Sequence, residues 1–159
     1  MLSNSERIFK KLKISRYDNP FMNESDLKSV LGLAITRLFE HQPNVFEFTA
    51  ETGQTEWNLA HHLAVEVHAF FPSLDYDLDV VKRNYKNMRP DLIFHRRGTH
   101  ESNYLVIEIK RDGNLREVEA DIEKIKRHWF KAPLHYQFGA AINLRSDGKH
   151  EIRVFENGV

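Results

Sequence analysis

The strongest constraint in this sequence is a polar loop joining two largely apolar segments, each of which carries an acidic residue. The first segment contains Asp91, in the triplet Arg-Pro-Asp, and the second is the run Leu-Val-Ile-Glu-Ile-Lys at residues 105–110. Residues 97–103 between them are polar and include a glycine, which predicts the loop of an antiparallel hairpin. If this loop is centred near residues 99–100, Asp91 lies almost opposite Glu108.

The alternation of side chains along a strand decides which residues of the second segment share a face. Glu108 and Lys110 point to one face of the sheet, and Ile107 and Ile109 point to the other. Two carboxylates on neighbouring strands, with Cβ atoms roughly 4.5–5.5 Å apart, destabilise a sheet. A divalent cation between Asp91 and Glu108 would reverse that effect, so the pattern predicts a metal site. The alternative is structural: a Glu108–Lys110 ion pair at a strand end, with Asp91 in a turn.

Apolar periodicity and breaking residues divide the chain into helices and strands. Helices are expected over residues 25–42, 56–70 and 115–130. Strands are expected over residues 76–81, 90–97, 104–110, 137–144 and 151–155. Ser25-Asp26 and Thr55 are the expected caps of the first two helices, and residues 45–49 could form a strand or a linker. The resulting order, α–β–β–β–α–β with a leading helix and a terminal strand, predicts an α/β fold.

The length of 159 residues is that of a single domain with one core. Residues 1–50 are expected to form an arm and an accessory helix, and residues 51–159 the core. The absence of cysteine excludes disulfides and thiolate metal sites. There is no apolar run of membrane-spanning length and no apolar stretch of a secretory signal at the start, so a cytoplasmic protein without membrane contact is expected.

The acidic and basic residues of the hairpin carry a family resemblance. Pro90-Asp91, followed by Glu108-Ile109-Lys110 at the end of the next strand, resembles the motif of the PD-(D/E)XK nuclease superfamily, over roughly residues 55 to 145. The resemblance implies a restriction-endonuclease-like core, α-β-β-β-α-β, in which helices flank a mixed central sheet. The N-terminal helix and the C-terminal strand would be additions to that core.

The resemblance also implies roles for individual residues. Phosphodiester cleavage with a hard cation needs oxygen ligands and a group that orients water. Asp91, Glu108 and the backbone carbonyl of Ile109 would bind Mg²⁺, with Mn²⁺ as a possible substitute. Lys110 would position the attacking water and stabilise charge that develops on the phosphate. Glu56 resembles the additional acid that many of these nucleases contribute from the first core helix, although an acid in a first helical turn is also favoured by the helix dipole.

Basic residues near these motifs are candidate contacts for nucleic acid, although the formal net charge of the chain is zero. The candidates are Arg89, Lys82, Arg83 and Lys124. Lys126 is a weaker candidate on the same helix as Lys124, and His95 is expected on the same side of its strand as Asp91. A solvated surface of mixed charge is the alternative explanation for these clusters.

Two functions agree with this pattern. The first is a metal-dependent endonuclease or exonuclease that acts on DNA in preference to RNA, and a homodimer would supply two sites for the cleavage of a duplex. The second is a non-catalytic binding or assembly module on the same fold, in a restriction, repair or mobile-element system. The neutral total charge favours the module, whereas the complete set of two acids and a lysine favours the enzyme.

Overall fold

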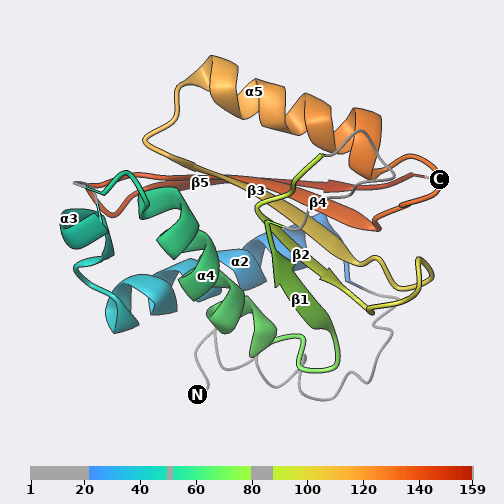
Figure 1. Cartoon of the computed structure of the whole chain (residues 1–159), viewed down its shortest axis with the longest axis horizontal. Helices are drawn as coiled ribbons and strands as arrows, with labels where there is room; N and C mark the ends of the chain where they lie inside the picture. The colour runs from blue at the N-terminus through green and yellow to red at the C-terminus, as the bar shows by residue number, and fades with distance from the viewer. Residues whose placement is uncertain (1–21, 50–51, 80–87, 159) are drawn as a thin grey trace.

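The computed structural model describes residues 22–49, 52–79 and 88–158, and within them a five-stranded mixed sheet lies between two helical layers (Figure 1). The strands are β1 (Asp75–Leu78), β2 (Leu92–His95), β3 (Leu105–Arg111), β4 (Phe138–Leu144) and β5 (His150–Glu156). They lie in the sheet in chain order, and the pair β3–β4 is parallel while the other neighbours are antiparallel. The expected α/β class is confirmed.

The helices cover the two faces of the sheet unequally. The helices on one side are α2 (Glu24–His41), α3 (Val45–Thr49) and α4 (Thr55–His68). The other side carries α5 (Leu115–Lys124), which continues as the π-helical turn η1 (Ile125–Trp129). This second layer is the crossover between the parallel strands β3 and β4, a connection that usually requires a helix.

Two apolar clusters occupy the two faces of the sheet. The larger cluster joins the sheet to α2 and α4 and includes Leu31, Leu63 and Phe94. The smaller cluster joins the sheet to α5 and η1 and includes Ile93 and Trp129. Since α2 contributes six buried residues and packs against α4 and β5, the accessory helix expected from the sequence belongs to the larger cluster.

Between residues 22 and 56 the helix boundaries differ from the sequence-based expectations in three places. Helix α2 begins at Glu24, one residue earlier than expected, because Asn23 is its cap, and Asp26 completes a capping box instead of acting as the cap itself. Residues 45–49, expected as a strand or a linker, form the short helix α3. Thr55 is not a cap either: it lies inside α4, is buried, and its hydroxyl oxygen accepts a hydrogen bond from the Thr49 hydroxyl at 2.9 Å.

Strands β1 and β2 are shorter than expected. In the described residues β1 ends at Leu78, and the expected positions 80 and 81 lie outside the described part. Strand β2 begins at Leu92, not at Pro90, because proline lacks the backbone N–H that a ladder requires.

The π-helical turn η1 begins at Ile125, which packs closely against Gly139 of β4. Gly139 on β4 faces Ile125, and a Cβ atom at Gly139 would collide with the Ile125 side chain. The expected helix 115–130 is α-helical only to Lys124, and the π turn that follows ends at Trp129, which is buried in the core. Within the described ranges no helix is both long enough and apolar enough to cross a bilayer.

Candidate functional site

The β2–β3 hairpin has the register that its loop suggested. Leu92 pairs with Ile107, so the next positions along the two strands are Asp91 and Glu108. Asp91 lies just before β2, and its Oδ2 accepts a hydrogen bond from the backbone N–H of Ile109 at 2.6 Å. This bond holds the Asp91 carboxylate against β3 at the point where regular pairing of the two strands has ended.

Glu108 is buried, with 2% of its surface exposed. Its Oε1 lies 2.8 Å from Nζ of Lys124 and accepts a hydrogen bond from Nε1 of Trp129 at 3.1 Å. Burial, together with the charge of Asp91, raises the pKa of Glu108 to about 7, although Lys124 acts in the opposite direction. Near neutral pH this carboxyl group therefore exchanges between its charged and neutral forms.

Lys110 extends from the end of β3 toward acids on both helical layers. Its Nζ lies 3.3 Å from Oδ2 of Asp121 on α5 and 3.9 Å from Oε1 of Glu56 on α4. Burial acts to lower the pKa of Lys110, but the carboxylates of Asp121, Glu56 and Asp91 together raise it above its ordinary value. The ammonium group is therefore held in its charged form.

These contacts define a mixed cluster, which we call the acid–lysine cluster: Glu56, Asp91, Glu108, Asp121, Lys110 and Lys124. Burial is the largest cause of the raised pKa values of all four carboxyl groups, and Asp91 also raises those of the other three. When every acid is ionised, four carboxylates face two ammonium groups, and two negative charges remain uncompensated. The cluster thus has the charge to bind a divalent cation.

Asp121 is the member of the cluster that reasoning from the sequence missed. It lies three residues after Val118 and four before Ile125, inside the stripe that α5 buries against the sheet. An acid at such a position is unusual for a helix that packs on a core. That interruption of the apolar stripe is the signal that could have identified it.

Asn143 is a second polar residue that the sequence analysis did not single out. It is buried on β4 beside Lys110, and its side-chain amide makes two hydrogen bonds with the backbone of Gly113, at 2.9 and 2.8 Å. Gly113 lies so close to Lys110 that a Cβ atom would approach the Lys110 Cβ to 2.8 Å. Asn143 therefore ties the segment just before α5 to β4, the neighbour of the strand that carries Glu108. A polar residue in an otherwise apolar strand was its signal.

The basic residues expected to contact nucleic acid lie in several different environments. The Arg89 guanidinium pairs with Asp79, with Nε 2.7 Å from Oδ1, and therefore does not point at the acid–lysine cluster. Lys124 does reach the cluster, whereas Lys126 lies over the ring of Phe155, 4.3 Å from its centroid. Lys82 and Arg83 lie outside the described residues.

His95, the expected neighbour of Asp91, is engaged elsewhere. Its Nε2 lies 2.6 Å from Oδ2 of Asp77 on β1, in a pair that Arg97 extends. His95 is therefore part of a separate charged group on the β1–β2 side of the sheet.

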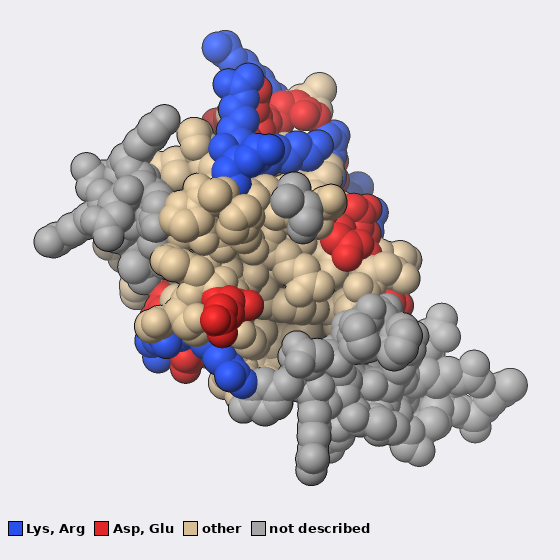
Figure 2. Space-filling model, turned by 90° about the vertical axis from the view of Figure 1, so that its right-hand side faces the viewer, with Lys and Arg blue, Asp and Glu red and all other residues tan. Residues whose placement is uncertain are grey.

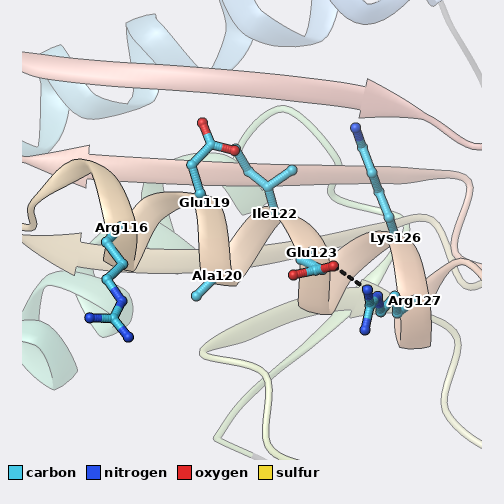
Figure 3. A pocket seen from close by; sticks show the side chains of 7 residues that line it. All are labelled: Arg116, Glu119, Ala120, Ile122, Glu123, Lys126 and Arg127. Atoms are coloured by element: carbon cyan, nitrogen blue, oxygen red, sulfur yellow. Dashed lines mark ion pairs between the residues drawn. The ribbon is translucent and has the colours of Figure 1, made fainter.

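A hollow of mixed charge lies along α5 and η1. The residues that line it are Arg116, Glu119, Ala120, Ile122, Glu123, Lys126 and Arg127 (Figure 3). Arg127 pairs with Glu123, and Arg153 pairs with Glu119, each at 2.5 Å, so these charges are largely matched. Figure 2 shows Lys and Arg side chains gathered over this end of the molecule with acidic side chains among them. The hollow lies on the side of α5 that faces away from the acid–lysine cluster.

The possible metal ligands of the acid–lysine cluster are few. In the described part of the chain, no three side chains of the Asp, Glu, His or Cys type come together as a ready group of metal ligands. The cluster instead offers the carboxylates of Asp91 and Glu108, which lie close enough for the charge of Asp91 to raise the pKa of Glu108, and the backbone oxygen of Ile109. No family model, curated protein or solved structure matches this chain, so the functional assignment depends on the geometry of this site and on the motif that its residues form.

Proposed function

We propose that this chain is a metal-dependent nuclease of the PD-(D/E)XK superfamily that hydrolyses phosphodiester bonds, in DNA in preference to RNA. The observation that carries the proposal is the meeting of Asp91 and Glu108 at the end of the β2–β3 pairing. Lys110 follows on the same face of β3 as Glu108. A buried acid pair destabilises a sheet unless something binds between the two carboxylates.

The order of the elements also supports this proposal. The series α4, β1, β2, β3, α5 and β4 has the order expected for a restriction-endonuclease-like core. On that alignment α2 and β5 are the additions, and the motif residues lie at the hairpin formed by the second and third strands. The proposed core is therefore covered on both faces by its own helices.

Mg²⁺ fits the donors that the cluster presents. It favours oxygen ligands and is commonly held by one or two carboxylates, with water and substrate phosphate completing the shell. Asp91 and Glu108 would supply the carboxylates, and the Ile109 carbonyl lies on the strand segment between Glu108 and Lys110. The absence of a three-residue ligand group within the described ranges suits Mg²⁺ better than Zn²⁺, which usually takes at least three protein ligands.

When bound, the ion would polarise the scissile phosphate and lower the pKa of a water molecule. The chain's own residues would orient the reactants. The Ile109 N–H fixes one oxygen of Asp91, and in the described part of the chain no hydrogen bond or ion pair involves its other oxygen. Lys110, held charged by Asp121 and Glu56, would stabilise negative charge on the phosphate and guide the attacking water.

The direct test is Mg²⁺-dependent cleavage of a mixture of duplex and single-stranded DNA and RNA. Asp91→Asn is the sharpest variant, because its side-chain oxygen can still accept the hydrogen bond from Ile109. We expect it to abolish cleavage while thermal unfolding remains cooperative. Glu123→Gln, on the exposed face of α5, is the matched control and should retain full activity. Undiminished cleavage by a contaminant-free preparation of Asp91→Asn would refute the nuclease proposal. Sedimentation of the same preparations would test the proposed homodimer.

One observation favours a non-catalytic binding module as the second candidate. Glu108 already has a cationic partner and a hydrogen-bond donor within the chain, Lys124 and Trp129. A site satisfied in this way can persist for structural reasons alone. Calorimetric titration with Mg²⁺ separates the two functions, because a module predicts no binding heat at any buffer pH, whereas the nuclease predicts saturable binding.

A further inference from the structure

The two lysines of the acid–lysine cluster are held by different acids. Lys110 contacts Asp121 and Glu56, whereas Lys124 contacts Glu108. Lys124 also donates a hydrogen bond from Nζ to the backbone carbonyl of Arg89 at 3.0 Å. The Lys124 ammonium thus bridges β3 and the residue two positions before Asp91, using oxygens from both sides of the hairpin.

This arrangement puts a positive charge beside the carboxylate that the proposed function assigns to the metal. A carboxylate and a peptide carbonyl are the oxygen types that a hard cation also uses. A divalent ion bound to Glu108 would lie close to the Lys124 ammonium, and the two positive charges would repel each other strongly where water is excluded. Both cannot occupy this end of the Glu108 side chain with the contacts that Lys124 makes here.

The Lys124 side chain can move away from Glu108 into solvent. Its side chain is 30% exposed, although its partner Glu108 is buried. A lysine ammonium is carried on a flexible four-carbon stem, so it can exchange a buried oxygen for water by rotation alone. The hydrogen bond from Trp129 would remain to hold Glu108 in position.

We propose that Lys124 is an internal counter-ion of Glu108 that a divalent cation must displace, so that this lysine sets the affinity of the site for metal. The inference rests on the proposed function, because it takes Glu108 as a metal ligand. Lys124 is a positioning residue in this scheme: it holds the Glu108 carboxylate in the metal-free protein and releases it when the ion enters.

The first experiment is calorimetric titration of the full chain with Mg²⁺ at pH 8.5. Lys124→Met removes the competing charge and should tighten binding by at least about tenfold. Lys124→Arg keeps the charge and should bind Mg²⁺ no more tightly than the wild-type chain. Lys126→Met removes the same charge from a site over Phe155, outside the cluster, and should change the affinity by less than about twofold.

A second experiment needs no substitution, so it remains informative if Lys124→Met does not fold. The wild-type chain is treated briefly with acetic anhydride, with and without Mg²⁺, and modification is measured by mass spectrometry. Displacement should increase the acetylation rate of Lys124 at least about threefold and leave that of Lys126 unchanged, because hydrogen-bonded amines react more slowly.

The outcomes separate the inference from the proposed function. Saturable Mg²⁺ binding with equal affinity in the wild type and Lys124→Met, or an unchanged acetylation rate of Lys124, overturns the counter-ion role and leaves the nuclease proposal standing. If neither protein binds Mg²⁺, both proposals fail. Binding by Lys124→Met alone would show that the lysine excludes the metal from the wild-type site, which supports the inference and overturns the nuclease proposal.

Discussion

Two glutamates are buried in the described part of the chain, and they are stabilised in different ways. Glu66 lies between α2 and α4 with 7% of its surface exposed, and two basic side chains contact it: Arg37 at 3.0 Å and His41 at 2.5 Å. Glu108 has Lys124 as its one ion-pair partner among the described residues, and the acid Asp91 lies beside it.

The difference shows what separates a structural carboxylate from a candidate ligand. Removing a carboxylate from water is tolerated when a partner of opposite charge contacts it, as Arg37 contacts Glu66. At Glu108 burial raises the pKa most, and the charge of the neighbouring Asp91 adds to that effect. A folded chain that keeps two acids side by side in this way gains stability when a cation binds between them. The comparison can be tested by making the same substitution at Glu66 and at Glu108.

The largest expected effect is on catalysis. Glu108→Gln should reduce Mg²⁺-dependent cleavage by at least about 10²-fold, because it removes one of the two ligand carboxylates. The same change at the other site, Glu66→Gln, should leave the cleavage rate unchanged. Initial rates on a fluorescent duplex measure both. Equal losses in the two variants would mean that the effect is one of folding and would remove the distinction between the sites.

The next effect is on the pH dependence of stability. The pKa of Glu108 is about 7 in the folded chain, compared with 4.5 for an unperturbed glutamate. The folded state therefore holds the proton more tightly than the unfolded state does. The contribution of this group to the free energy of unfolding therefore falls as pH rises from about 4.5 to about 7, and the loss persists above that range. Glu108→Gln should be more stable than the wild type at pH 8 by up to about 3 kcal/mol, and nearly equal to it at pH 4.5.

Urea unfolding at pH 4.5, 6, 7 and 8 measures this difference. Other carboxyl groups of the cluster also have raised pKa values, so the quantity to follow is the difference between the variant and the wild type at each pH. Glu66→Gln supplies the matched background, and it should not become more stable than the wild type at pH 8. A Glu108→Gln protein that is less stable than the wild type at pH 8 would contradict the inference that the ionised Glu108 destabilises the folded state.

A smaller effect is expected at Gly139, where β4 packs against the η1 turn that carries Trp129. Gly139→Ala adds a methyl group against Ile125, so η1 must move and Trp129 with it. We expect a loss of about 1–3 kcal/mol in the free energy of unfolding and a shift of the Trp129 fluorescence, measured in a Trp57→Phe background. Gly148→Ala is the control for a glycine with open space around it but a positive φ of 84°, and it should not alter the fluorescence.

The smallest effect is expected on the exposed face of α5. Glu123 and Arg127 form an i,i+4 ion pair in which both side chains are more than half exposed. Replacing Glu123 with Gln should change the free energy of unfolding by less than about 0.5 kcal/mol, and added salt should reduce even that difference. A larger change would mean that this face contributes to the core, contrary to its position in Figure 3.

The sequence determined those features that depend on local pattern. The alternation within residues 105–110 and the polar loop at 97–103 were enough to predict the hairpin, its register and the shared face of Glu108 and Lys110. Helices α2 and α4, and α5 together with η1, were predicted to within a few residues, because their apolar stripes are long and regular. Short elements carried too little pattern: β-branched and aromatic residues at 45–49 favour a strand, yet tertiary packing makes them a helix.

Only the tertiary structure decided how the charges are partnered. The positions of Asp121 and Lys124 along α5 do not reveal which strand residues they meet, because that depends on how the helix docks on β3 and β4. The docking is set by non-local contacts, including the close approach of Gly139 to Ile125 and the tie between Asn143 and Gly113. Side-chain type and spacing are local properties of the chain, whereas the electrostatic environment of a buried carboxylate is a sum over neighbours that are distant in sequence, and folding alone brings them together.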